Sequence, residues 1–199
     1  MGGVEKALMI LDDRPLIAHA ADRMRQQVAS LILNANGDPA RFAGLKLEIV
    51  PDQTGDRPGP LAGILAALDW FAANAPAVTA IASLPADTPF APDDLVTRLR
   101  DALAQNPKTP VAVAQSHGRR HPVIALWKPD AAPEIRAALE RGERKAETMI
   151  DRLGAAAVPF PDLDIAGRKI DPFFNVNTPE DLDTAREILP ALNRREPAP

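Results

Sequence analysis

The sequence predicts an α/β fold with a mainly parallel sheet and an antiparallel edge. Apolar runs of strand length alternate with helical periodicity through the first half of the chain, as in a parallel sheet covered by helices on both faces. Two apolar runs in the second half, at 111–114 and 123–127, flank a polar turn and predict an antiparallel pair. The 199 residues suffice for one substantial core, so we expect a single domain over 1–192 and a frayed tail over 193–199.

Seven apolar runs carry the expected strands. Each is rich in aliphatic residues and is closed by turn-forming residues such as Asn, Asp, Gly or Pro. In chain order the runs are 7–11, 28–33, 45–50, 77–83, the pair 111–114 and 123–127, and 155–160, with a short extended piece at 173–177.

Segments of helical periodicity lie between these runs. Pro15 suits the first turn of a helix, and apolar residues then recur at helical spacing up to Met24. Thr178 and Asp181 are spaced as in a capping box, which predicts the start of the last helix. The expected helices cover about residues 15–24, 61–71, 92–105, 132–140, 146–153 and 178–189.

The composition excludes several classes of function. Without cysteine, the chain forms no disulfide, Cys-ligated zinc site, iron–sulfur cluster or thiol nucleophile. A formal net charge of -4 argues against a general nucleic-acid-binding surface. No apolar run approaches the roughly 18 residues of a transmembrane helix and no signal peptide opens the chain, so we expect a cytoplasmic protein without a membrane partner.

Polar side chains follow several of the expected strands. In a parallel sheet the C-terminal ends of the strands lie along one edge, where the ligands of open α/β folds bind. Asn and Asp are also common turn formers, so each single residue has a purely structural alternative. We expect the set as a whole to mark a binding edge, and its members are Asn34, Asn36, Asp52, Asp87, Asn175 and Asn177.

Asp87 is the most informative member of this set. It follows the apolar run 77–83 on a turn bracketed by Pro85 and Pro89. A lone carboxylate at the end of a strand is well placed to hold a divalent cation against a phosphate chain. The alternative is a loop aspartate that caps the following helix.

Two glycine-containing segments and one histidine add weaker indications. Gly2 and Gly3 would let backbone N–H groups approach an anion that Lys6 neutralises, although a flexible N-terminus has the same composition. Gly63 lies in the first turn of a helix, where a polar ligand or close helix–sheet packing would both favour glycine. His121 could contact a substrate or transfer a proton, and a structural role is the commoner one.

Taken together, these segments resemble the molybdenum cofactor guanylyltransferase family of the MobA type. The similarity runs in family order over nearly the whole chain. N-V-N-T-P-E-D-L combined with P-G-P-L-A-G is the more specific part, because D-T-P and the glycine–lysine opening occur in many nucleotidyltransferases. The matching pieces are M-G-G-V-E-K at 1–6, P-L-I at 15–17, L-N-A-N at 33–36, P-G-P-L-A-G at 58–63, P-A-D-T-P-F at 85–90, H-P-V-I-A-L at 121–126 and F-N-V-N-T-P-E-D-L at 174–182.

The resemblance implies a three-layer, Rossmann-like nucleotidyltransferase fold. It also implies transfer of GMP from GTP to molybdopterin carrying molybdenum, with release of pyrophosphate, Mg²⁺ as cofactor, and molybdoenzymes or their chaperones as protein partners. The residues implied to bind the nucleotide are Gly2, Gly3, Lys6, Asn34, Asp52, Gly63 and Asp87. Asp87 would also hold the metal, and Lys6 and Asp87 would be the catalytic residues. Asn175 and Asn177 would contact the pterin.

The chain departs from the family at its start. The family opens with a strand and a glycine-rich loop of the form L-A-G-G-x-S-x-R ahead of M-G-G, whereas this sequence begins at M-G-G. The resemblance therefore implies that the first strand, most phosphate-binding amides and an arginine are missing. A start codon assigned too late and a genuine truncation both explain this departure.

Two other functions fit the same sequence features. One is a sister nucleotidyltransferase that transfers CMP to molybdopterin or acts on another alcohol or phosphate. The other is a non-catalytic protein that keeps the fold and binds a nucleotide or a molybdoenzyme partner, which the missing N-terminal loop favours.

Overall fold

The structure is a computed structural model that describes residues 6–52, 59–165 and 167–193. Its centre is a four-stranded sheet whose order is β5 (Ile81–Ser83), β7 (Arg119–Trp127), β6 (Val111–Ser116) and β8 (Ala156–Pro159). β7 runs antiparallel to β5 and β6, and β8 runs parallel to β6, so three of these strands share one direction. The expected α/β fold with a mainly parallel sheet is therefore confirmed.

The position of the antiparallel strand differs from the expectation, because β7 lies inside the sheet and not at its edge. The turn His117–Gly118, in which both residues have positive φ, folds β7 back onto β6. The second half of β7 is fully buried, so its remaining edge needs a partner, and β5 supplies one. The hairpin of β6 and β7 therefore forms the two inner strands of the sheet.

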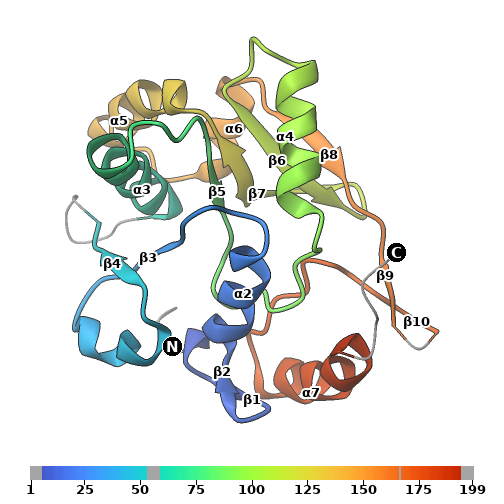
Figure 1. The fold of residues 1–199 in the computed structure, drawn as a ribbon. Coiled ribbons are helices and arrows are strands. Elements are labelled where there is room, and N and C mark those ends of the chain that lie inside the picture. Colours follow the sequence, from blue (N-terminus) through green and yellow to red (C-terminus); the bar gives the residue numbers. More distant parts are fainter. Residues whose placement is uncertain (1–5, 53–58, 166, 194–199) are drawn as a thin grey trace.

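Helices cover both faces of this sheet, which gives the three layers that the resemblance implied (Figure 1). On one face α3 (Pro60–Asn74), α5 (Ala132–Glu140) and α6 (Ala146–Arg152) pack on Val111 and Val113. On the other face α4 (Leu95–Gln105) packs on Ala112 and Ala114. Successive residues of β6 thus point to opposite cores, as the period of a strand requires.

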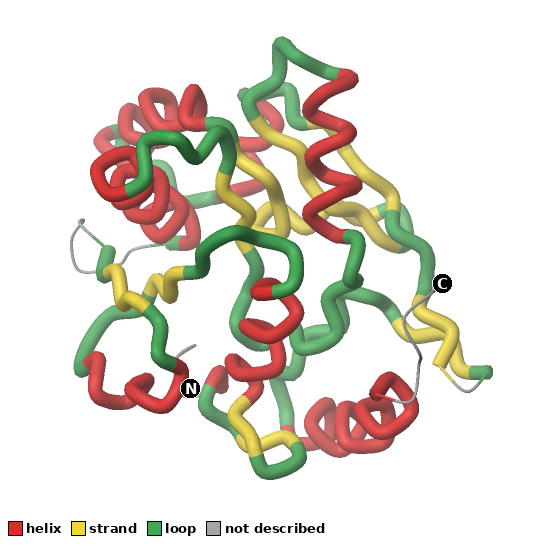
Figure 2. Tube along the Cα trace, viewed as in Figure 1, coloured by secondary structure: helices red, strands yellow, loops and turns green. Residues whose placement is uncertain are grey.

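The second part of the molecule lies below the sheet in Figures 1 and 2. Its elements with fully described bounds are a parallel pair of strands, two short antiparallel hairpins, two helices and a 3₁₀ helix, while a second 3₁₀ helix, η2 (Pro129–Ala131), precedes α5. Its elements are β1 (Ile10–Leu11), β2 (Arg14–Pro15), α2 (Leu16–Arg25), β3 (Ile32–Asn34), η1 (Pro39–Leu45), β4 (Glu48–Val50), β9 (Leu163–Ile165), β10 (Arg168–Ile170) and α7 (Pro179–Asn193).

The expected strand at 7–11 is wrong for most of its length. Asp12 and Asp13 adopt positive φ angles of 48° and 62°, so the chain reverses there and leaves only a two-residue strand on each side. The hairpin of β9 and β10 and the helix η1 were not expected, because none of them has a long apolar run. The capping box is confirmed: Thr178 Oγ1 accepts from the Asp181 amide, and Asp181 accepts from Thr178.

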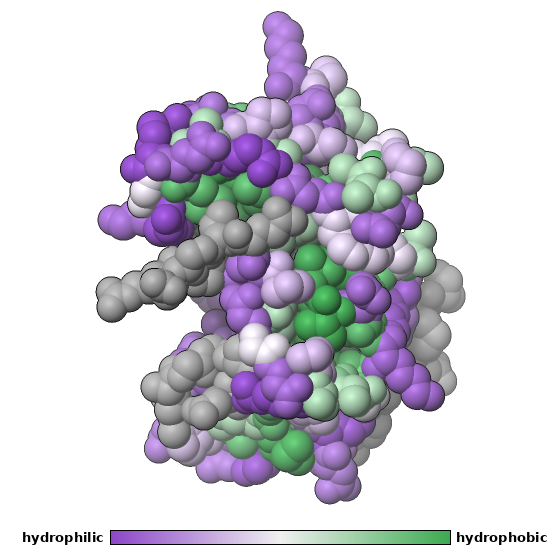
Figure 3. Space-filling model, turned by 90° about the vertical axis from the view of Figure 1, so that its left-hand side faces the viewer, coloured by the Kyte–Doolittle hydropathy of each residue, from purple (hydrophilic) through white to green (hydrophobic). Residues whose placement is uncertain are grey.

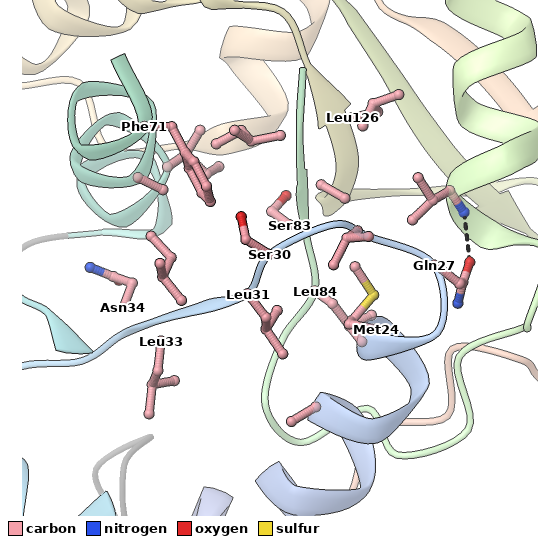
Figure 4. A pocket seen from close by; sticks show the side chains of 18 of the residues that line it. Met24, Gln27, Ser30, Leu31, Leu33, Asn34, Phe71, Ser83, Leu84 and Leu126 are labelled. Carbon is pink, nitrogen blue, oxygen red and sulfur yellow. Dashed lines mark hydrogen bonds between the residues drawn. The ribbon is translucent and has the colours of Figure 1, made fainter. Parts of the chain in front are cut away.

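A cavity of about 680 Å³ separates β3 from β5. β3 pairs only with β4, β5 pairs only with β7, and in the part of the chain that the structure describes no strand lies between them. Apolar side chains from α2, α3 and the two strands line the cavity, with Met24, Leu31 and Phe71 among those that surround it in Figure 4. Figure 3 shows hydrophobic side chains gathered in a hollow between the upper and lower parts of the molecule.

This cavity predicts opposite outcomes for two neighbouring alanines of α3. Ala67 lines the cavity, whereas Ala66 is 1% exposed in packed surroundings. Ala67→Leu should be neutral or stabilising because the added atoms enter empty space. Ala66→Leu should lower the free energy of unfolding by about 1–3 kcal/mol through overpacking. Urea denaturation measures both, and equal destabilisation by the two variants would show that no such space exists.

Candidate active site

Asp87 lies on the turn that follows β5, as its sequence position predicts. The turn is closed by the Thr88 amide, which donates to the Pro85 carbonyl at 3.2 Å, and Phe90 behind it is fully buried. The Asp87 side chain is half-buried, and this burial raises the pKa of its carboxyl group, while Lys6 and the Asn175 side chain oppose the rise. A partly desolvated carboxylate next to a single cation favours a further positive charge.

Lys6 and the segment 173–177 meet at this carboxylate. The Val176 amide donates to the Asp87 carbonyl at 3.0 Å, and Val176 itself is fully buried. Asn175, next to it, hydrogen-bonds the Asp87 carboxylate and lowers its pKa. Lys6 Nζ donates to Asn177 Oδ1 at 3.1 Å. Three parts of the chain that are far apart in sequence therefore supply one polar cluster, which we call the Asp87 cluster: Lys6, Asp87, Asn175 and Asn177.

A second polar cluster lies at the ends of β3 and β4. Parallel pairing sets Asn34 opposite Val50, so the residues that follow both strands come together. The Asp52 carboxylate accepts from Asn34 Nδ2 at 2.9 Å and from Asn36 Nδ2 at 2.7 Å, and the Asp52 amide donates to Asn36 Oδ1 at 2.9 Å. We call these three residues the Asp52 cluster. The family resemblance assigned no role to Asn36. The sequence feature that indicated it is the N-x-N spacing directly after the strand.

Gly63 is fixed by its closeness to this second cluster. A Cβ atom at position 63 would lie 2.2 Å from Asn34 Oδ1 and 3.5 Å from an Asp52 carboxylate oxygen. The first turn of α3 therefore approaches the Asp52 cluster more closely than any side chain allows. Among the described residues no side chain caps the N-terminus of α3 at Gly59, and the positive end of the helix dipole lies at this region.

The two clusters border the same small group of apolar residues. Ala7 packs in one cluster of apolar side chains with Leu33, Ala35 and Ala86. These residues are the sequence neighbours of Lys6, of Asn34 and of Asp87. The structure thus places the sequence-predicted residues in two clusters beside one apolar group, whereas Gly2 and Gly3 lie outside the described residues. One cluster holds Lys6, Asp87, Asn175 and Asn177, and the other holds Asn34, Asn36 and Asp52 with Gly63 next to it.

The donor set limits how a metal ion can bind. Within residues 6–52, 59–165 and 167–193, no group of three or more His, Asp and Glu side chains is arranged to hold a metal. Asp87 can supply one carboxylate, and the remaining ligands would then be phosphate oxygens and water, which is the usual environment of Mg²⁺ at phosphate sites. The half-buried Asp87 carboxylate fits such an ion, since a cation would offset its desolvation.

A third polar group, which the sequence did not predict, lies beside the segment 173–177. Ser116 Oγ is 2.7 Å from His121 Nε2 and donates to Asp171 Oδ2 at 3.1 Å. Burial lowers the pKa of His121, and Asp171 opposes this effect. The three residues come from β6, β7 and the loop after β10, so only the tertiary fold brings them together.

None of the helices in the described ranges is both long and apolar enough to cross a membrane.

Comparison with known proteins identifies the family. Residues 1–157 match the model of the MobA-like NTP transferase domain. The chain is 46% identical, over 94% of its length and 87% of the relative's, to a molybdenum cofactor guanylyltransferase of Rhodopseudomonas palustris (strain BisB5). It is 45% identical, over 98% of its length and 90% of the relative's, to that of Bradyrhizobium sp. (strain ORS 278).

Solved structures agree on the fold. The molybdopterin-guanine dinucleotide biosynthesis protein A of Archaeoglobus fulgidus superposes with a TM-score of 0.68 at 24% identity, covering 94% of this chain and 91% of that one. A 4-diphosphocytidyl-2C-methyl-D-erythritol synthase of Anaerococcus prevotii also reaches 0.68, at 11% identity and coverage of 91% and 88%. The sequence match, together with this nucleotidyltransferase fold, shows that the chain belongs to the molybdenum cofactor guanylyltransferases of the MobA-like NTP transferase family.

Proposed function

We propose that this chain transfers GMP from GTP to molybdenum-loaded molybdopterin, with Asp87 and Lys6 acting on the phosphates and Mg²⁺ held by Asp87. The observation that carries the proposal is the convergence of Lys6, Asp87 and Asn175 on the turn after β5. In this cluster the Asp87 carboxylate can bind a metal cation, the Lys6 ammonium group can bind phosphate, and the Asn175 amide can bind the second substrate. The family membership supports the reaction, and this geometry supports the roles.

The reaction needs no covalent intermediate on the protein. A terminal phosphate oxygen of the pterin attacks the α-phosphorus of GTP, the bond from that phosphorus to the bridging oxygen breaks, and pyrophosphate leaves. Such transfers depend mainly on positioning and on neutralising charge. Mg²⁺, when bound, would neutralise charge on the phosphates. Lys6 would stabilise the charge that develops on pyrophosphate, and its bond to Asn177 Oδ1 holds the ammonium group near Asp87.

The Asp52 cluster fits the guanine and ribose end of GTP. Guanine presents N–H donors at N1 and N2. Each Asp52 carboxylate oxygen accepts one amide and retains a further acceptor site, and Asn34 Oδ1 faces α3 beside Gly63. The N-terminus of α3 adds a positive dipole end at the same place. Asn175 and Asn177, which are exposed beside Asp87 and Lys6, are left to face the pterin.

Substitution of Asp87 tests the metal and phosphate role. Asp87→Asn should lower kcat for guanylyl transfer roughly a hundredfold or more, because it removes the charge that holds the cation. The melting temperature should not fall, since burial makes the charged carboxylate unfavourable in the folded state. Pyrophosphate release and thermal melting measure the two effects. Asp101→Asn, on the exposed face of α4, is the matched control. Near wild-type turnover by the Asp87 variant would contradict the assignment.

Substitution of Gly63 tests the nucleotide end separately. Gly63→Ala places a methyl group against Asn34 Oδ1, so it should raise KM for GTP roughly tenfold with little change in kcat. Gly44→Ala is the matched control, because nothing lies within 4 Å of a Cβ there. An unchanged KM for GTP in the Gly63 variant, measured by initial rates at saturating pterin, would remove the Asp52 cluster from the nucleotide site.

The choice of base is a further outcome of this arrangement. We expect kcat/KM for GTP to exceed that for CTP by roughly a hundredfold or more. The Asp52 carboxylate oxygens would accept hydrogen bonds from the guanine N–H groups, whereas cytosine would place an acceptor atom against them. Asp52→Ala should reduce this ratio. Competition between the two nucleotides in the pyrophosphate assay measures it, and a preference for CTP would support cytidylyl transfer instead.

A further inference from the structure

A chain of hydrogen bonds joins the β6–β7 hairpin to the loop after β10. Ser116 is 3% exposed, and its hydroxyl donates to Asp171 Oδ2 at 3.1 Å. A carboxylate only accepts, so the single hydroxyl proton is used in this bond. The His121 Nε2 atom, 2.7 Å from Ser116 Oγ, then carries a proton and donates it to the oxygen. His121, Ser116 and Asp171 thus form one directed chain, which we call the His121 relay.

The His121 relay fixes the first part of the segment 171–177. Asp171 Oδ1 accepts from the Phe173 amide at 2.9 Å, and the Asp171 carbonyl accepts from the Phe174 amide at 3.0 Å. The His121 ring also touches the segment directly, since its centroid lies 4.8 Å from that of Phe173. Phe173 is 4% exposed and packs edge-on against Phe160. A polar contact from Ser116 of β6 and an aromatic contact from His121 of β7 therefore hold this loop.

The other end of the segment is bound to the Asp87 cluster. Val176 donates to the Asp87 carbonyl, Asn177 accepts from Lys6, and Asn175 hydrogen-bonds the Asp87 carboxylate. Only three residues separate Asp171 from Asn175. A change in the position of Asp171 must therefore move Asn175 relative to Asp87 unless the short loop between them absorbs it.

We propose that His121 is a positioning residue for guanylyl transfer, which acts through Ser116 and Asp171 to hold Asn175 against Asp87 and Asn177 against Lys6. The proposal rests on the proposed function, because it assigns the segment to the pterin substrate. His121 touches neither the phosphates nor the Asp87 carboxylate in this account. It acts on the second substrate through the loop that carries the two asparagines.

The charges around His121 set the direction of its pH dependence. Burial lowers the pKa of His121, Asp171 opposes this, and Arg119 and His117 lower it further. His117 itself pairs with Asp162. A pKa below that of the free side chain means that the folded arrangement favours the neutral ring. When the pH falls through this lowered pKa, His121 becomes protonated and the folded arrangement of His121, Ser116 and Asp171 loses stability. KM for the pterin should therefore rise at acid pH.

Kinetics of two variants at position 121 test the proposal. His121→Phe keeps the ring contact with Phe173 but removes the donor, so KM for molybdenum-loaded molybdopterin should rise about tenfold while KM for GTP changes less than twofold. His121→Gln keeps an N–H donor and should restore part of the loss. The acid-side rise in KM should be absent from both variants. His117→Asn, on the exposed turn beside it, is the control and should leave both KM values unchanged.

A double-mutant cycle and hydrogen exchange complete the test. Ser116→Ala should raise KM for the pterin as His121→Phe does, and the two changes together should raise it no further, because each breaks the same chain. Amide exchange at Val176 and Asn177 should be faster by about tenfold in either variant, a readout that needs no enzymatic activity and so separates this proposal from the proposed function. Equal losses for GTP and pterin, additive effects in the cycle, or unchanged exchange at 176 and 177 would each overturn it.

Discussion

The hydrogen bond from the Val176 amide to the Asp87 carbonyl is the contact on which the site depends. Without it, the turn after β5 and the loop before α7 would be independent surface segments. With it, Asn175 and Asn177 lie beside a half-buried carboxylate and a lysine that come from 88 to 171 residues earlier in the chain. Both partners are backbone groups and Val176 is fully buried, so the contact is insensitive to changes of exposed side chains. Side chains supply the chemical groups of the site, but the main-chain hydrogen bond between Val176 and Asp87 positions them.

The sequence predicts the local elements well and the long-range pairings less well. The helix at 132–140 has the bounds of α5, because its periodicity and flanking residues are local signals. The positive φ angles at Asp12 and Asp13 and the insertion of β7 between β5 and β6 depend on contacts that no window of the sequence contains. Strand-end position was enough to expect both asparagine–aspartate groups, whereas the His121 relay joins residues up to 55 positions apart and has no local signature.

The division between β3 and β5 has consequences for how the site is supported. Asn34 and Gly63 lie at the rim of the cavity, and Ala86, next to Asp87, also lines it. Within the described residues, the two polar clusters are therefore connected through the apolar group around Ala7 and through α3, and not through a continuous ladder of strands. Unpaired strand edges beside an apolar cavity cost stability. The relative placement of the Asp52 and Asp87 clusters should accordingly be the least rigid part of the site.

The most direct test of this account is a crystal structure of the full chain with Mn²⁺ and a GTP analogue that cannot release pyrophosphate. The account predicts anomalous density for the metal within about 2.2 Å of an Asp87 carboxylate oxygen, with the phosphates on Lys6 and the base at the Asp52 cluster. A metal and triphosphate bound away from Asp87, with Lys6 and Asn175 free of ligand, would contradict it.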